Sequence, residues 1–284
     1  MKFSNIKYLI LRRVSQLTIM FLYFAANVWG WKILQGNLST STIFSKIPLS
    51  DPFALLQMLA AGAVVGVNVL IGALIISIFY GLIGGRAFCS WVCPINMVTD
   101  LAAWLRRKLY IDKIERKVWI SRNIRYYTIV IALIVSAITG LAAFEVINPI
   151  TILNRNIIYG INIINNTTVV ALGAGLGFVL VIFLFDLFVV KNGWCGHICP
   201  VGGTYSLIGK FSLLRVKHTS ENCTLCMKCK EVCPESQVLH MIGKDSITVN
   251  DIECTNCGRC IDVCDDDALG FSIGKYIKKE KAKS

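Results

Sequence analysis

Eight cysteines in the last quarter of the chain follow one spacing twice. Each set of four reads Cys-x2-Cys-x2-Cys-x3-Cys, and the second set starts 31 residues after the first. Three thiolates on one tight loop can hold three irons of a cubane, while the fourth cysteine reaches the neighbouring cubane. The spacing therefore predicts two [4Fe–4S] clusters, with one held by Cys223, Cys226, Cys229 and Cys264 and the other by Cys254, Cys257, Cys260 and Cys233.

Zinc and disulfides are the alternatives for these eight cysteines. Zinc takes four ligands from paired Cys-x2-Cys units, so a third cysteine at the same interval in both sets is superfluous for it. Disulfides need an oxidising compartment, whereas we expect this tail on the reducing side of a membrane. One departure from the two-cluster run is that Asp265-Asp266-Asp267 follows Cys264, where Pro234 follows Cys233. We expect a less firmly fixed turn at Cys264 and a lower local potential.

Two Cys-x3-Cys-Pro motifs lie upstream, 106 residues apart, and contain Cys89, Cys93, Cys195 and Cys199. Cysteines at i and i+4 share one face of a helix, so each motif is expected to present a thiol pair toward the other. Three interpretations stay open. The four cysteines form a third metal or cluster site, a redox-active dithiol, or a structural set of small buried residues.

The residues that must position these motifs are strongly apolar. Hydrophobic residues make up 55% of the 284 residues, only 16% are charged, and the mean hydropathy is +0.62. These values exclude an ordinary soluble domain and a short disulfide-dense secreted protein. Four apolar runs are long enough to cross a bilayer, at about residues 14–34, 55–85, 126–144 and 168–190. Amphipathic stretches at 95–109 and 201–214 are expected to lie along the membrane interface.

The charge distribution predicts the orientation. Residues 1–210 hold 18 Lys and Arg against 6 Asp and Glu, which gives the whole net charge of +12, whereas residues 211–284 hold 11 of each. The neutral tail argues against nucleic acid as a partner. The basic residues cluster before the first run and between the second and third, so both termini are expected in the cytoplasm. No small-residue cleavage pattern follows Trp29-Gly30-Trp31, so the first run is expected to stay as an anchor.

These features predict an α-helical integral membrane protein with a C-terminal α+β ferredoxin domain. Residues 1–210 form the membrane domain, in which two spans and a Cys-x3-Cys-Pro motif occur twice as a two-fold internal repeat. Residues 211–284 form the two-cluster domain, with its motifs at about 213–243 and 244–274. The predicted location is the inner membrane.

Polar groups beside the apolar runs are candidates for proton chemistry. Asp186 lies in the fourth run, His197 lies in the second Cys-x3-Cys-Pro motif, and Asp100 follows the first motif. A carboxylate inside a membrane is a functional candidate by default. Oxidation of a quinol releases two electrons and two protons, and we expect Asp186 and His197 to accept the protons. The alternatives are that Asp186 pairs with Lys191 and that His197 is a satisfied interfacial residue.

The stretches Gly85–Pro94 and Trp194–Pro200, together with the two-cluster tail, resemble the NapH family of membrane-bound ferredoxin-type quinol dehydrogenase subunits. The resemblance implies that electrons come from menaquinol or ubiquinol in the quinone pool. It further implies that they pass, with a periplasmic iron–sulfur partner resembling NapG, toward a periplasmic reductase. Nitrate is the first expected acceptor, and nitrous oxide is the other.

Two alternatives of different classes remain. All twelve cysteines are expected on the cytoplasmic side, whereas the acceptor implied by the resemblance is periplasmic, so the route of the electrons stays open. The chain is alternatively an accessory factor for maturation of a respiratory metalloenzyme, although only 3 His and 6 Met argue against metal delivery. A membrane-anchored redox sensor is the other alternative, and no output module follows the tail.

Overall fold

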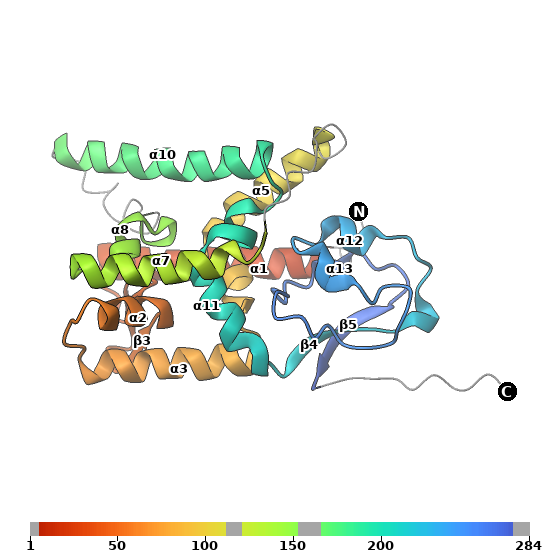
Figure 1. Ribbon diagram of the computed structural model, residues 1–284, viewed down its shortest axis with the longest axis horizontal. Helices are drawn as coiled ribbons and strands as arrows, with labels where there is room; N and C mark the ends of the chain where they lie inside the picture. Colours follow the sequence, from red (N-terminus) through yellow and green to blue (C-terminus); the bar gives the residue numbers. More distant parts are fainter. Residues whose placement is uncertain (1–5, 112–120, 153–165, 275–284) are drawn as a thin grey trace. The chain divides into compact units, whose positions relative to one another are not determined.

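The structure is a computed structural model that describes residues 6–111, 121–152 and 166–274, with the side chains of 166–174 left aside. It is mostly helical (Figure 1). The longer helices are α1 (Lys7–Trp29), α2 (Pro52–Ala60), α3 (Val67–Ile83), α5 (Ile95–Lys108), α7 (Ile124–Thr139), α10 (Asn166–Phe188) and α11 (Pro200–Ile208). The chain divides into two compact units. The ferredoxin unit comprises 1–15, 79–92 and 205–284, and the apolar unit comprises 16–78 and 93–204.

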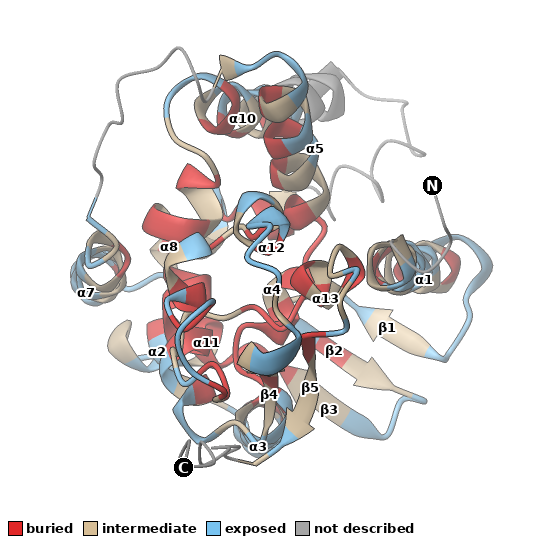
Figure 2. Ribbon diagram, turned by 90° about the vertical axis from the view of Figure 1, so that its right-hand side faces the viewer, coloured by how far each residue is buried: buried red, intermediate tan, exposed pale blue. Residues whose placement is uncertain are grey.

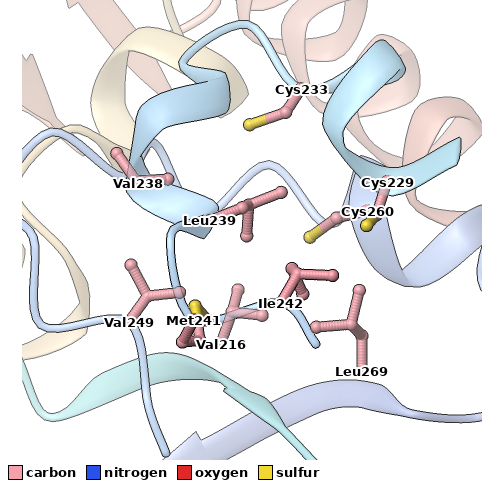
Figure 3. Packing of buried hydrophobic residues seen from close by; sticks show 10 residues of the cluster. All are labelled: Val216, Cys229, Cys233, Val238, Leu239, Met241, Ile242, Val249, Cys260 and Leu269. Carbon is pink, nitrogen blue, oxygen red and sulfur yellow. The ribbon is translucent and has the colours of Figure 1, made fainter. Parts of the chain in front are cut away.

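The ferredoxin unit has a two-stranded antiparallel sheet and two short helices. Strand β4 (Leu214–His218) pairs with β5 (Leu269–Ile273). The segment before the first cysteine loop is therefore hydrogen-bonded to the segment after the second cysteine loop. The helices α12 (Lys228–Val232) and α13 (Arg259–Asp262) each follow one loop. Figure 3 shows the buried core between these elements. It contains Val216, Val238, Leu239, Met241, Ile242, Val249 and Leu269 together with Cys229, Cys233 and Cys260.

The apolar unit contains a small sheet that the sequence did not lead us to expect. Strands β1 (Leu34–Gly36), β2 (Thr40–Ile43) and β3 (Ile47–Ser50) form an antiparallel meander between the first two apolar runs. Phe44 and Ser45 turn the chain between β2 and β3 with positive φ angles. The backbone of β3 approaches α3 so closely that a side chain at Gly72 would meet the backbone of Leu49 and Ser50.

The expected span at 55–85 is not one helix, which corrects that prediction. Helix α2 ends at Ala60, and α3 begins only at Val67. Gly62, with φ +71°, and Gly66 lie in the break, where their conformational freedom favours a turn over a continued helix. The third span also ends earlier than expected, because Gly140 adopts the left-handed conformation after Thr139. The chain then forms a separate short helix, α8 (Ala143–Ile147).

One helix of the described ranges, α1, has both the length and the apolar character needed to cross a bilayer. Shorter apolar helices cover Val67–Ile83, Ile124–Thr139 and Gly175–Phe188. On α7, only Arg125 and Ser136 are buried, and Figure 2 shows most of this helix as exposed or intermediate.

The two Cys-x3-Cys-Pro motifs do not form the expected i, i+4 helical faces. Helix α4 (Ala87–Trp91) ends before Cys93, and the π-helical turn Trp194–Ile198 ends before Cys199, which is extended with φ −62° and ψ 114°. Proline disfavours the helical conformation of the residue before it, so Pro94 and Pro200 exclude Cys93 and Cys199 from the preceding turn. Each motif thus has its first cysteine on a short helix and its second cysteine beyond it.

Candidate functional site

The structure brings together the four cysteines of the first expected ligand set. Burial raises the pKa of the Cys229 thiol, and the charges of Cys223, Cys226 and Cys264 raise it further. All four cysteines line one pocket, which His218 also lines. Cys264 therefore reaches across from the second motif, as the spacing requires for a crossed pair of clusters.

The second set gathers in the same way. Burial raises the pKa of the Cys233 and Cys260 thiols well above its ordinary value. Cys257 and Cys254 add to the rise at Cys233, and Cys257, Cys233 and Cys254 add to it at Cys260. Figure 3 shows Cys233 turned into the core, with the sulfurs of Cys229 and Cys260 close together. The two sets thus meet at Cys229 and Cys260 in the buried core of the ferredoxin unit.

The two loops repeat the same unusual backbone. The residues on either side of the middle loop cysteine have positive φ angles in both motifs: Leu225 and Met227 in the first, and Asn256 and Gly258 in the second. A left-handed conformation is costly for leucine and methionine, so such positions persist only where the structure requires them. Here they curl each loop around its cysteines, which is the shape that a cubane needs.

Burial favours the protonated form of Cys233, Cys254 and Cys260. Burial raises the pKa of Cys254 to about 12, and the positive charge of Arg86 lowers it only in part. Iron must therefore displace protons from these thiols when a cluster is assembled, because thiolates are the ligands.

The arrangement fits a cubane better than a single ion. No three His, Cys, Asp or Glu side chains of the described part of the chain are placed around one ion position. Zinc needs four ligands at about 2.0–2.3 Å from one point. In a cubane each thiolate binds a different iron, so four thiols line a wider space, as they do in the pocket around Cys229. The residues therefore fit two [4Fe–4S] clusters.

The acidic run after Cys264 has a defined role that the sequence did not reveal. Asp266 accepts a hydrogen bond from the backbone N–H of Thr224 at 3.3 Å, and Asp265 pairs with Lys228 at 2.7 Å. Both partners lie on the first cysteine loop. These side-chain bonds between the two motifs thus fix the backbone that follows Cys264. At the equivalent position of the first motif, Pro234 follows Cys233.

A segment from the apolar half of the sequence holds the second cysteine loop. Ser90 donates to the carbonyl oxygen of Thr255 at 2.7 Å, and the indole of Trp91 donates to that of Asn256 at 3.0 Å. The Asn256 amide in turn donates to the carbonyls of Ile83 at 3.3 Å and Leu214 at 2.8 Å. The residues that follow Cys89 therefore contact the loop between Cys254 and Cys257 directly.

The start of α1 completes the packing around the second loop. The backbone N–H groups of Tyr8 and Leu9 donate to Asp262 of α13 at 2.9 and 3.1 Å. Arg12 donates to the carbonyl of Ser90 at 3.0 Å, and Ser15 donates to that of Trp91 at 2.9 Å. These bonds satisfy carbonyls at the end of α4, which a five-residue helix cannot satisfy internally.

The second Cys-x3-Cys-Pro motif is anchored by Asp186, which is fully buried on α10. Its carboxylate accepts from the backbone N–H of Trp194 at 2.9 Å, at the start of the turn that carries Cys195 and His197. Arg106 of α5 donates to the carbonyl of Leu187 at 2.8 Å, which joins α5 to the end of α10. Asp186 therefore positions the motif whether or not it also accepts protons.

The four upstream cysteines differ in their burial. Cys195 donates a weak hydrogen bond to Thr99 of α5 at 3.9 Å, so the second motif contacts the helix that follows Cys93. Cys93 and Cys199 are buried, whereas Cys89 and Cys195 are partly exposed. His197 is buried in the π-helical turn. Convergence of all four cysteines on one centre stays a prediction.

Sequence reasoning missed the residues that link the motifs. The charge count treated Arg12, Arg86, Arg106 and Arg125 as basic residues of loops, whereas all four are buried. For Arg86, the sequence did offer an indication of a role near the cysteines. It is a lone arginine at the end of a long apolar run, three residues before Cys89. His218, buried with its Nδ1 at 2.8 Å from the Asp245 carbonyl, was not singled out.

Comparison with known families matches both cysteine-bearing regions. A family described as "4Fe-4S binding domain" matches residues 65–112 and 171–218, and each segment contains one Cys-x3-Cys-Pro motif. A family described as "4Fe-4S dicluster domain" matches residues 215–265. No solved structure matches the chain. The chain is an iron–sulfur protein of the ferredoxin type.

Several similar proteins cover most of the chain. The ferredoxin-type protein NapH of Haemophilus influenzae is 44% identical over 82% of this chain and 77% of its own length, and NapH of Escherichia coli is 42% identical over the same shares. The methylamine utilization ferredoxin-type protein MauN of Methylorubrum extorquens is 41% identical over 81% of this chain and 75% of its own. This chain therefore belongs to the family of ferredoxin-type electron-transfer proteins that includes NapH and MauN.

Proposed function

We propose that this protein is a membrane-embedded electron-transfer subunit that oxidises quinol and passes electrons toward a periplasmic reductase, with nitrate as the first expected acceptor. The observation that carries the proposal is the pair of interleaved cysteine sets, held by the segment that follows an apolar helix. The eight cysteines of these sets would each bind one iron, and the clusters would supply one-electron chemistry. The ferredoxin-type NapH relatives at 42–44% identity support the assignment to electron transfer.

The surfaces of the helices support a multi-pass location in the inner membrane. Large apolar side chains are exposed along α3, α7 and α10, including Leu74, Ile78, Ile134, Ile138 and Leu180. An exposed apolar surface of this extent is costly in water and favourable in lipid. The membrane lipid would therefore be the first partner, and four spans with both termini in the cytoplasm remain our proposal.

Asp186 and His197 are the proposed proton acceptors for the quinol. Both are buried in the apolar unit, and Asp186 is bonded to the first residue of the turn that carries Cys195 and His197. A quinol gives up two protons as its two electrons leave, so proton acceptors must lie beside the electron acceptor. The carboxylate of Asp186 and the imidazole of His197 are chemically suited to this step.

An iron–sulfur centre is the interpretation that we favour for Cys89, Cys93, Cys195 and Cys199. Both motifs lie in segments similar to a 4Fe-4S binding family, which supports a cluster over a structural set of buried thiols. Such a centre would be the electron acceptor nearest to the quinol. The partner beyond the membrane is proposed to be a periplasmic iron–sulfur protein resembling NapG.

A direct experiment is quinol oxidation by membranes from a deletion strain, with nitrate and nitrous oxide offered as separate acceptors. We expect one of the two activities to disappear and to return with the wild-type chain. The Cys257→Ala chain, which lacks a ligand of the second cluster, should restore much less. Loss of neither activity, with a fully assembled terminal reductase, would contradict the proposal.

The second candidate is an accessory role in maturation of a metalloenzyme. MauN proteins, which are named for methylamine utilization, are almost as similar to this chain as NapH proteins are. Similarity therefore does not fix the final acceptor. A deletion strain whose reductase protein is present but lacks its metal centres would favour this candidate, because a quinol-oxidising subunit is not needed to insert metal.

A further inference from the structure

Arg86 is a fully buried cation in the ferredoxin unit, and it binds two glutamates at once. Its Nη1 lies 2.9 Å from Oε1 of Glu235 and 3.0 Å from Oε2 of Glu253, and it donates to the carbonyl of Glu253 at 2.8 Å. The side chains are 1%, 3% and 12% exposed, respectively. Water screens such a group weakly, so its charge acts strongly on its neighbours.

Both glutamates are attached to ligands of the second cluster. Glu235 follows Cys233-Pro234, and Glu253 directly precedes Cys254. The charge of Arg86 also reaches the Cys254 thiol, whose pKa it lowers against the larger effect of burial. The Arg86 side chain is therefore tied to two points of the same ligand set.

Arg86 also interacts electrostatically with Cys89, three residues further on. Burial lowers the pKa of Arg86, but the charges of Glu235, Cys89 and Glu253 outweigh burial and raise it, so the guanidinium stays charged. One cation thus acts on both Cys89 and Cys254.

The first cluster set has a different electrostatic environment. Its loop carries the ion pair of Lys228 and Asp265, whose side chains are 55% and 54% exposed. Cys226 in this loop is exposed as well. Water screens charges at such positions, so a change there should affect the cluster weakly.

We propose that Arg86 is a positioning residue that raises the reduction potential of the second cluster selectively and fixes it as the cluster adjacent to Cys89. This inference rests on the proposed function, in which the eight cysteines hold two clusters. Reduction of a cluster adds one negative charge, and a buried cation nearby stabilises the added charge. Arg86, Glu235 and Glu253 together carry a net charge of −1. Removal of the cation changes this to −2, and removal of one glutamate changes it to zero.

The test is a redox titration of the two clusters, followed by electron paramagnetic resonance on the anaerobically purified full-length chain. Arg86→Gln should lower the potential of the second cluster by about 59 mV, which is a tenfold change in a one-electron equilibrium constant. Glu235→Gln should raise it. The double variant should return it toward the wild-type value, because the net charge is again −1. Cys226→Ser identifies the signal of the first cluster.

The matched control is Lys244→Gln, which removes a cation from an exposed position of the ferredoxin unit. It should leave both potentials nearly unchanged. Shifts of opposite sign in Arg86→Gln and Glu235→Gln, confined to the second cluster, would support the inference, since loosened packing alone would not reverse sign with charge.

Two results separate failure of this inference from failure of the proposed function. If both variants keep their iron but neither shifts the second cluster, or both clusters shift equally, Arg86 has no selective role and the function is untouched. If the wild-type chain itself holds no iron–sulfur clusters, the proposed function fails. If Arg86→Gln loses the second cluster, Glu235→Gln decides: a raised potential supports the inference, and an unchanged one overturns it.

Discussion

Ser90 donates a hydrogen bond of 2.7 Å to the carbonyl oxygen of Thr255, across 165 residues of sequence. Ser90 follows the first cysteine of a Cys-x3-Cys-Pro motif, and Thr255 follows the first cysteine of the second cluster loop. Both residues are buried. The bond therefore joins two cysteine motifs that the sequence presents as separate modules.

Loss of this bond should destabilise the second loop. Ser90→Ala leaves the buried carbonyl of Thr255 without the hydroxyl donor, which typically costs about 1–3 kcal/mol. The measurement is the free energy of unfolding from denaturant titration, followed through the second cluster. Ser45→Ala is the control, because it removes an exposed side-chain bond to Gln35. Equal effects of the two substitutions would show that the Ser90 bond contributes little.

The matching loop positions Met227 and Gly258 should respond in opposite directions to substitution. Met227 has φ +59° and is exposed, so Met227→Gly relieves backbone strain and should stabilise the chain by about 1 kcal/mol. Gly258 has φ +72°, and a side chain there would overlap the ring of Tyr8. Gly258→Ala should therefore destabilise the chain and weaken the contact of α1 with α13. Thermal unfolding of both variants with clusters intact measures the difference.

The iron-free chain should lose stability as the pH rises above about 9. Burial raises the folded-state pKa of Cys254 from 9.0 to about 12, and it raises the pKa of Cys233 and Cys260 as well. Because these pKa values are raised in the folded chain, the unfolded chain releases the thiol protons at a lower pH than the folded chain does. The contribution of the protonated thiols to folding stability is therefore complete below pH 9 and is lost as the pH rises toward 12. Urea titrations between pH 7.5 and pH 10.5 measure this slope. A flat profile would contradict burial of these thiols, and the cluster-bound chain should lack this slope because its thiolates carry no protons.

Asp186 has a structural bond and a proposed chemical role that substitution can separate. Asp186→Asn keeps an oxygen that accepts from the Trp194 N–H but cannot accept a proton near neutral pH. We expect the variant to fold and to bind iron normally, with quinol oxidation slowed by roughly 100-fold. Asp186→Leu removes the acceptor too and should reduce the stability of the second motif. Normal quinol oxidation by the asparagine variant would limit Asp186 to its structural role.

Cys264 should be a ligand of the first cluster although no proline follows it. Cys264→Ala is expected to lower the iron and acid-labile sulfide of the purified chain, and to alter the signal of the first cluster alone. The bonds of Asp265 and Asp266 to the first loop supply the reason, because they hold the exit from Cys264 in place. Asp267→Asn is a suitable control in the same acidic run. An unchanged iron content would remove Cys264 from the ligand set.

Cysteine spacing predicted which cysteines the structure brings together. Short-range geometry dictates that three thiols on a tight loop share a cubane and that the fourth crosses, and the structure groups the eight cysteines accordingly. Apolar runs likewise indicated apolar helices at α1, α3, α7 and α10, although within the described ranges α1 alone has both the length and the apolar character to cross a bilayer. The break at 61–66 was missed because glycine turns inside an apolar run leave its hydropathy unchanged.

What the sequence by itself determined is therefore local: which residues are apolar, which cysteines share a loop, and where proline stops a turn. Only the tertiary structure decided that the charge of Arg86 lies beside the second set, that Asp186 anchors the second Cys-x3-Cys-Pro motif, and that Ser90 holds Thr255. These contacts depend on backbone groups and side chains brought together from distant parts of the chain. Composition gives the number of charged arginines, but it does not show whether each arginine is exposed to solvent or is buried and paired with an acidic residue.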